Sequence, residues 1–138
     1  MLVDRLATAQ DLGNGVFHEM LFEGSVTAYT LTSVSREAID TWTEVQIGVL
    51  KEWPDNRPLC VLYDQSQLAL TYTPYMKSRF SDLEKATKGK SGRLAIVFGK
   101  GFMMQLATMF AKNFDMGGMN VSFFQNYDEA LAWLQEIL

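Results

Sequence analysis

The sequence has few of the side chains on which most catalytic and metal sites depend. Its 138 residues include one cysteine, Cys60, and one histidine, His18. A single thiol cannot form an internal disulfide, and a free thiol fits a reducing compartment, so we expect a cytoplasmic protein. A zinc site would need at least two carboxylates in addition, and the sequence contains no closely spaced ligand set. We therefore expect no metal and no cofactor.

Runs of basic residues are also missing. Twelve Lys and Arg stand against sixteen Asp and Glu, which gives a net charge of -4. Proteins that bind nucleic acids or acidic membranes need a basic patch, so we expect neither activity. No stretch approaches eighteen uninterrupted apolar residues, and Asp4 and Arg5 stand where the apolar run of a signal peptide would begin. The sequence thus predicts neither a membrane span nor a secretion signal.

Proline is scarce, and each of the three prolines stands where an element is expected to begin or end: Pro54, Pro58 and Pro74. No linker, repeat or low-complexity segment divides the chain, although residues 1–14 are weakly patterned. A chain of this length with 48% hydrophobic residues can bury a core without a disulfide or a metal. We therefore predict a single domain over residues 1–138.

Strand-like and helix-like segments alternate along the chain. Apolar, β-branched and aromatic runs predict five strands, at 16–22, 26–31, 59–63, 93–98 and 121–124. The first two strands form a hairpin through Glu23-Gly24-Ser25. A further strand before Asn14-Gly15 is not supported by alternation.

Four helices are expected between and after these strands. They run from an N-cap at Ser33 or Ser35 to Trp53, from an N-cap at Thr73 to about Lys88, from Gly101 to about Phe114, and from an N-cap at Asn126 onward. Apolar residues at helical spacing predict one buried face on each of the first two helices, around Trp42 and around Phe80. Their alternation with strands and the short connections predict an α/β fold with a mixed, mostly parallel sheet and an N-terminal hairpin.

Few residues stand where chemistry is expected. His18 is predicted to be a partly exposed strand residue rather than a general base, and Cys60 an inert core thiol. Asp64 ends a central strand at the carboxyl edge, where ligands of open α/β sheets bind. The commoner role of such an aspartate is to accept amides of its own loop. Lys100, between Gly99 and Gly101, opens a helix where an anion could bind, although such glycine turns are often purely conformational.

The segment 102–114 carries more apolar surface than one sheet face covers. On a helical wheel its apolar residues span roughly 220°, and only Gln105, Thr108 and Lys112 form a clearly polar strip. Residues 103–119 also contain five of the eight methionines, and methionine adapts to variable apolar shapes. Two interpretations stay open. Either the helix is deeply buried between two others, or its surplus lines a ligand cavity or a protein interface.

Four segments follow one another in the order LCVLYD, GRLAIVFG, VSFF and YDEALAWL. With the hairpin before them and the Met-rich helix among them, they resemble the SpoIIAA-like branch of the STAS domain superfamily over about residues 15–138. This branch is related in fold to anti-sigma-factor antagonists and to lipid-carrying CRAL-TRIO domains. The resemblance implies a non-enzymatic module that binds protein partners, nucleotides or lipophilic molecules.

In the antagonists, a serine is phosphorylated in an Asp-Ser-Ser-Gly-like segment at the start of the helix after the third strand. Here that place reads Thr71-Tyr72-Thr73-Pro74, without the Asp, Ser and Gly. Thr73 stands in the corresponding place, where a phosphate at a helix N-terminus would be electrostatically favourable.

We therefore expect a non-enzymatic domain that binds a small apolar or amphipathic ligand, or a protein partner, against 102–114 and the loop after Asp64. A homodimer is compatible with the apolar surplus. The residues expected to form the site are Asp64, Tyr72, Thr73, Lys100, Phe102, Met103 and Met104. One alternative is a phosphorylation-switched regulator of the antagonist type acting through Thr73 or Ser66. Another is a small enzyme that uses Asp64 and Lys100.

Overall fold

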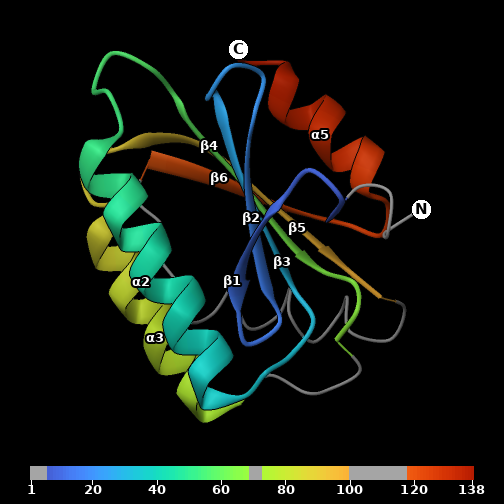
Figure 1. Ribbon diagram of the computed structural model, residues 1–138. Coiled ribbons are helices and arrows are strands. Elements are labelled where there is room, and N and C mark those ends of the chain that lie inside the picture. The colour runs from blue at the N-terminus through green and yellow to red at the C-terminus, as the bar shows by residue number, and fades with distance from the viewer. Residues whose placement is uncertain (1–5, 69–72, 100–117) are drawn as a thin grey trace.

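The computed structural model describes residues 6–68, 73–99 and 118–138. Six strands form one sheet, with helices on both of its faces (Figure 1). The strands are β1 (Gln10–Gly13), β2 (Val16–Leu21), β3 (Val26–Leu31), β4 (Leu59–Gln65), β5 (Ser91–Phe98) and β6 (Gly118–Phe124). The described helices are α2 (Arg36–Glu52), α3 (Pro74–Ala86) and α5 (Tyr127–Gln135).

The strands lie in the sheet in the order β1-β2-β3-β4-β5-β6. The pairs β1–β2 and β2–β3 are antiparallel, and β3 to β6 pair in parallel. This confirms the α/β class and the mixed, mostly parallel sheet with an N-terminal hairpin. Three of the four expected helices lie in the described ranges, and the helix expected at 101–114 lies outside them.

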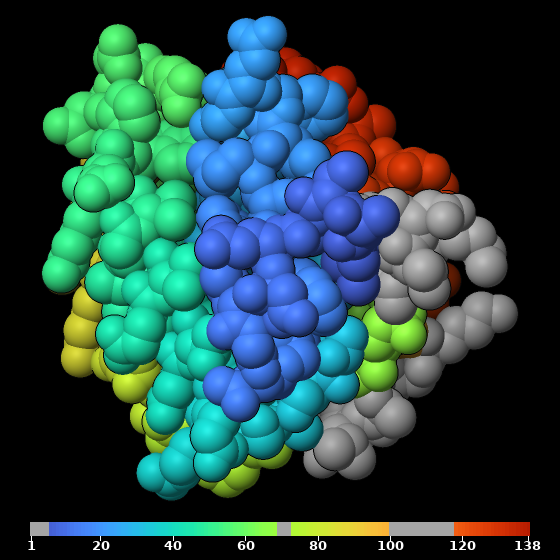
Figure 2. Space-filling view, viewed as in Figure 1, coloured from blue at the N-terminus to red at the C-terminus, as the bar shows by residue number. Residues whose placement is uncertain are grey.

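The prediction of five strands is wrong, because β1 adds a sixth. Its burial pattern shows no alternation, since three of its four residues are exposed. The turn that follows forms the hairpin instead: Asn14 and Gly15 both have positive φ, as in the tight turns that suit a twisted strand pair. The Asn14 side chain also donates to Thr41 Oγ1 of α2 at 3.2 Å. The hairpin and α2 lie next to each other at the surface (Figure 2).

The helix starts follow the predicted caps. The side chains of Ser35, Thr73 and Asn126 accept hydrogen bonds from backbone N–H groups three residues later, at the starts of α2, α3 and α5. Each cap satisfies an N–H group that the helix itself leaves without a partner. Strand ends are less well predicted, since β4 continues two residues beyond Tyr63. None of the described helices is both long and apolar enough to cross a membrane.

Helices α2 and α3 cover one face of the sheet through an aromatic cluster. The Trp42 ring of α2 meets Tyr63 of β4 at 4.9 Å and Phe80 of α3 at 5.2 Å between ring centroids, both edge-on. Tyr29 of β3 lies 6.1 Å from Tyr63. Edge-to-face contacts of this kind add to the stability gained from burial. The predicted apolar faces of both helices are confirmed, with Ile39 and Met76 also buried.

Helix α5 covers part of the opposite face. Its Ala130 and Leu134 are buried in one cluster with Cys60 and Leu62 of β4 and Ala95 of β5. Every residue of β4 is therefore buried, as is usual for a parallel strand covered on both faces.

Strands β4 and β5 lie close together at Gly92, which pairs with Leu59. A Cβ atom added to Gly92 would lie 1.9 Å from the carbonyl oxygen of Leu59 and 2.6 Å from its backbone nitrogen. Because these are backbone atoms of the central strand, they cannot rotate away as a flexible side chain can. The parallel pairing of β4 with β5 thus requires glycine at this position.

We predict that Gly92→Ala lowers the free energy of unfolding by about 2 kcal/mol or more. The matched control is Gly48→Ala, on the exposed side of α2, where an added Cβ meets no atom within 4 Å. Alanine there should raise stability by about 0.5–1 kcal/mol, since it favours the helix over the unfolded chain. Urea unfolding of both variants measures these changes in the free energy of unfolding. A Gly92→Ala protein as stable as the wild type would refute the close approach of β5 to β4.

Candidate functional site

The carboxyl ends of β3, β4 and β5 lie at one edge of the sheet, because these strands are parallel. Thr30, Asp64 and Val97 are in register across the three strands near that edge. The loop that leaves β4 begins at Ser66, and Thr73 is the N-cap of α3. Two of the predicted site residues, Asp64 and Thr73, therefore frame the same connection.

Asp64 is buried, with 1% of its surface exposed, on the sheet face that α5 partly covers. Its Oδ1 accepts hydrogen bonds from the Ser66 amide at 3.0 Å and from the Ser66 hydroxyl at 2.6 Å. These bonds are the loop-capping role expected for an aspartate at this position. They also compensate part of the cost of burying the carboxylate. The structure thus brings Asp64 and Ser66 together.

Thr73 combines two features of a helix start. Its side chain accepts a hydrogen bond from the Met76 amide at 3.1 Å, and Pro74 follows it at the first helical position. The cap prediction is confirmed. The positive end of the thirteen-residue α3 therefore lies at Thr73, where negative charge is stabilised.

Gln65 is a residue at this edge that the sequence analysis missed. It ends β4 with 3% of its surface exposed, and its Nε2 has no hydrogen-bond partner in the described ranges. A buried amide donor without a partner is costly, and such donors are rare in folded proteins. The only sequence signal was its position, because Gln65 follows Asp64 at the end of the apolar run 59–63. It adds a donor at the carboxyl end of the central strand.

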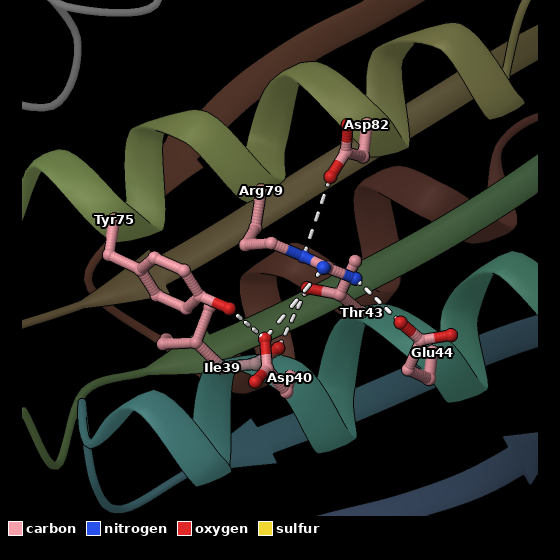
Figure 3. A network of polar contacts seen from close by, with 7 residues as sticks. All are labelled: Ile39, Asp40, Thr43, Glu44, Tyr75, Arg79 and Asp82. Atoms are coloured by element: carbon pink, nitrogen blue, oxygen red, sulfur yellow. Dashed lines mark hydrogen bonds and ion pairs between the residues drawn. The ribbon is translucent and has the colours of Figure 1, made fainter.

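Helix α3 is held against α2 by a polar network centred on Arg79 (Figure 3). The Arg79 guanidinium lies 2.8 Å from Glu44, 3.8 Å from Asp40 and 3.5 Å from Asp82. The Tyr75 hydroxyl donates to Asp40, and this bond is the first cause of the raised pKa of Tyr75. Since Tyr75 lies in the first turn of α3, the network fixes the start of the helix, and with it Thr73, relative to α2.

The remaining predicted site residues lie outside the described ranges. They are Tyr72, Lys100, Phe102, Met103 and Met104. The geometry of an Asp64–Lys100 pair is therefore not described. In the described parts of the chain, no group of three or more His, Cys, Asp or Glu side chains could hold a metal ion.

His18 and Cys60 lie on opposite faces of the sheet. The His18 ring stacks on Tyr29 at 4.6 Å, and its Nε2 lies 2.9 Å from Thr27 Oγ1, which in turn lies 3.1 Å from the Tyr29 hydroxyl. Burial lowers the pKa of His18, so the neutral ring is favoured. Burial raises the pKa of the Cys60 thiol. Both residues match their predicted structural roles.

A scan of family models matches residues 22–135 to the family described as SpoIIAA-like. The searches of curated proteins and of solved structures returned no match.

We predict that the stability of the protein falls as the pH drops below about 6.5, the pKa of an unperturbed histidine. The unfolded chain then binds a proton at His18 that the folded chain, with its lowered pKa, does not bind. The dependence ends once the pH falls below the folded pKa. Urea unfolding at pH 7.5 and 5.5 should show a smaller acid loss in His18→Gln than in the wild type. Equal losses would contradict this role of the histidine.

Proposed function

Because the chain belongs to the SpoIIAA-like family, we propose that it is a regulatory binding domain that performs no chemistry of its own. Its occupant is a small apolar or amphipathic ligand, or a protein partner, bound at the carboxyl edge of the sheet. The SpoIIAA-like description indicates a regulatory domain of the anti-sigma-factor-antagonist type, and domains of this family interact with protein partners.

The observation that carries the proposal is the set of polar groups at the carboxyl edge of β4. The Gln65 amide donor is buried without a partner in the described ranges, and the Asp64 carboxylate stands one residue before it, on the opposite face of the strand. The connection that follows ends at the positive end of α3. A ligand oxygen that accepts from Gln65 would remove the cost of that unpaired donor. This arrangement favours an occupant with a polar end directed at the edge.

The apolar part of the occupant is assigned to the segment 102–114. Phe102, Met103 and Met104 supply apolar contacts in this proposal, and Tyr72 and Lys100 supply further polar ones. The support is the apolar surplus of that segment together with its position in the chain directly after β5, whose carboxyl end lies at the same edge. Methionine-rich surfaces suit ligands of variable shape.

Native mass spectrometry of gently purified protein tests the proposal. We expect a bound molecule that is lost on denaturation, or a complex with a partner or a second copy. The double variant Met103→Gln, Met104→Gln should lower the bound fraction, since it makes the apolar contacts polar. The matched control is Met20→Gln on β2, because Met20 is 44% exposed and lies away from this edge. A monomer without any bound molecule would contradict the binding proposal. An equal bound fraction in both variants would contradict the assignment of the apolar contacts to the segment 102–114.

A second candidate function is a regulator switched by phosphorylation, and the local geometry favours Thr73 as its phosphorylation site. A phosphate on Thr73 would sit at the N-terminus of α3, where the helix dipole stabilises it. A phosphate on Ser66 would instead lie against the Asp64 carboxylate, which now accepts from the Ser66 hydroxyl. Repulsion there would break the loop cap. Thr73 is therefore the better phosphorylation site of the two.

Phosphopeptide mapping of protein from its source cells tests this candidate, and we expect phosphate on Thr73. Thr73→Val should abolish the modification and lower the free energy of unfolding by about 1 kcal/mol, because the helix loses its cap. Thr73→Ser keeps both the cap and the acceptor hydroxyl and should behave as the wild type. A map with neither Thr73 nor Ser66 modified would remove this candidate.

A further inference from the structure

Helix α5 contacts the sheet mostly through half-buried side chains, and its Tyr127 hydroxyl donates to Glu19 Oε1 of β2 at 3.5 Å. It has nine residues, of which only Ala130 and Leu134 are buried. Isolated helices of this length do not persist in water, so α5 depends on its docking against the sheet. It is also the last element of the described chain, joined to β6 by the exposed residues Gln125 and Asn126.

One side chain, Arg93 of β5, holds the last turn of α5. Its Nη1 donates to the Trp133 carbonyl oxygen at 2.6 Å and to Glu136 Oε1 at 2.8 Å. Its guanidinium also lies 4.7 Å from the centroid of the Trp133 ring. A positive charge at a helix C-terminus is favourable, and hydrogen bonds from a charged donor are stronger than neutral ones. Across the described ranges, Arg93–Glu136 is the ion pair that links α5 to the rest of the molecule.

We propose that α5 is a hinged cover, which opens as a unit about residues 125–126 when Arg93 releases its last turn, while the sheet and the pair α2–α3 stay folded. The other face of the sheet is held differently. There α3 is buried through Met76, Phe80 and Leu83 and is bound to α2 by the Arg79 network. Regions with fewer buried contacts open at lower free energy than the core.

The reactivity of the Cys60 thiol can report the opening of α5. Cys60 is the single cysteine, it has no exposed surface, and it lies in one cluster with Ala130 and Leu134 of α5. Arg93 is its register partner on β5. Opening of α5 returns the thiol to water, where it reacts with a disulfide reagent. The rate of Cys60 labelling under native conditions therefore measures how often α5 is open.

The experiment compares Cys60 labelling by an aromatic disulfide reagent in the wild type and in Arg93→Gln, alongside urea unfolding of each. Arg93→Gln should lose some global stability, which by itself speeds up Cys60 labelling. We expect its labelling rate to be about tenfold higher than this loss of stability explains. Wild-type labelling should depend only weakly on urea, because a local opening exposes little surface. The matched control is Arg79→Gln, since the two arginine side chains are 20% and 19% exposed and both form ion pairs. Its labelling should change only as its global stability does.

Labelling that follows global unfolding in all three proteins would overturn the proposal. If Arg93→Gln fails to fold, Glu136→Gln decides, because it removes the carboxylate partner and keeps the bond to the Trp133 carbonyl. It should also accelerate labelling beyond its stability change, by a smaller factor. Unchanged labelling in Glu136→Gln would then refute the role of Arg93 in holding the last turn of α5. Hydrogen exchange of the wild type provides an independent test. We expect the backbone amides of α5, at 127–135, to exchange before those of β5 at 94–98. Simultaneous exchange of both sets would contradict the proposal.

Discussion

The burial of β4 on both faces is the constraint on which the other elements depend. All seven of its residues are buried. A parallel strand in this position needs backbone partners on both sides, which β3 and β5 provide, and apolar cover above and below. Helices α2 and α3 supply the cover on one face and α5 contributes on the other. Gly92 makes the required approach of β5 to β4 sterically possible.

The same constraint explains why the polar groups gather at one edge. A polar side chain within a buried strand must find a hydrogen-bond partner inside the protein. Tyr63 meets this demand through Gln46 of α2, at 3.4 Å, and Asp64 through Ser66. Gln65, at the very end of the strand, has an amide donor that no described residue accepts. This difference along a single strand supports the proposal of a binding site at the carboxyl edge.

The two faces of the sheet are stabilised in different ways. The α2–α3 face combines large interlocked rings, such as Trp42 and Phe80, with a network of charges between the helices. The α5 face packs small residues such as Ala95 and Ala130, and one arginine closes the helix end. Interlocked packing of large side chains resists partial opening more than a nine-residue helix with two buried residues does. The fold thus pairs a rigid layer with a layer that can detach.

Local patterns in the sequence predicted most of the fold. Periodicity identified the buried face of α2 around Trp42, and hydroxyl or amide caps located the starts of α2, α3 and α5. Strand β1 was missed, because a short exposed strand has no alternation and only its turn marks it. The clusters around Arg79 and Arg93 were also missed. They join residues 35 to 43 positions apart, and no local pattern encodes which distant carboxylate an arginine will meet.

Part of the candidate site could also be predicted from local sequence patterns. Asp64 and Thr73 are marked by their place at the ends of a strand and a helix. Gln65 needed the three-dimensional structure, since its significance lies in the missing partner rather than in its position.

Two-dimensional NMR of the ¹⁵N-labelled protein, before and after removal of the bound molecule, tests binding at the carboxyl edge most directly. We expect amide shifts to change at residues 64–66 and 73–76. Amides at the opposite edge, at Leu59 and Gly92, should stay in place. Identical spectra, or changes confined to the amino edge, would contradict a binding site at the carboxyl end of β4.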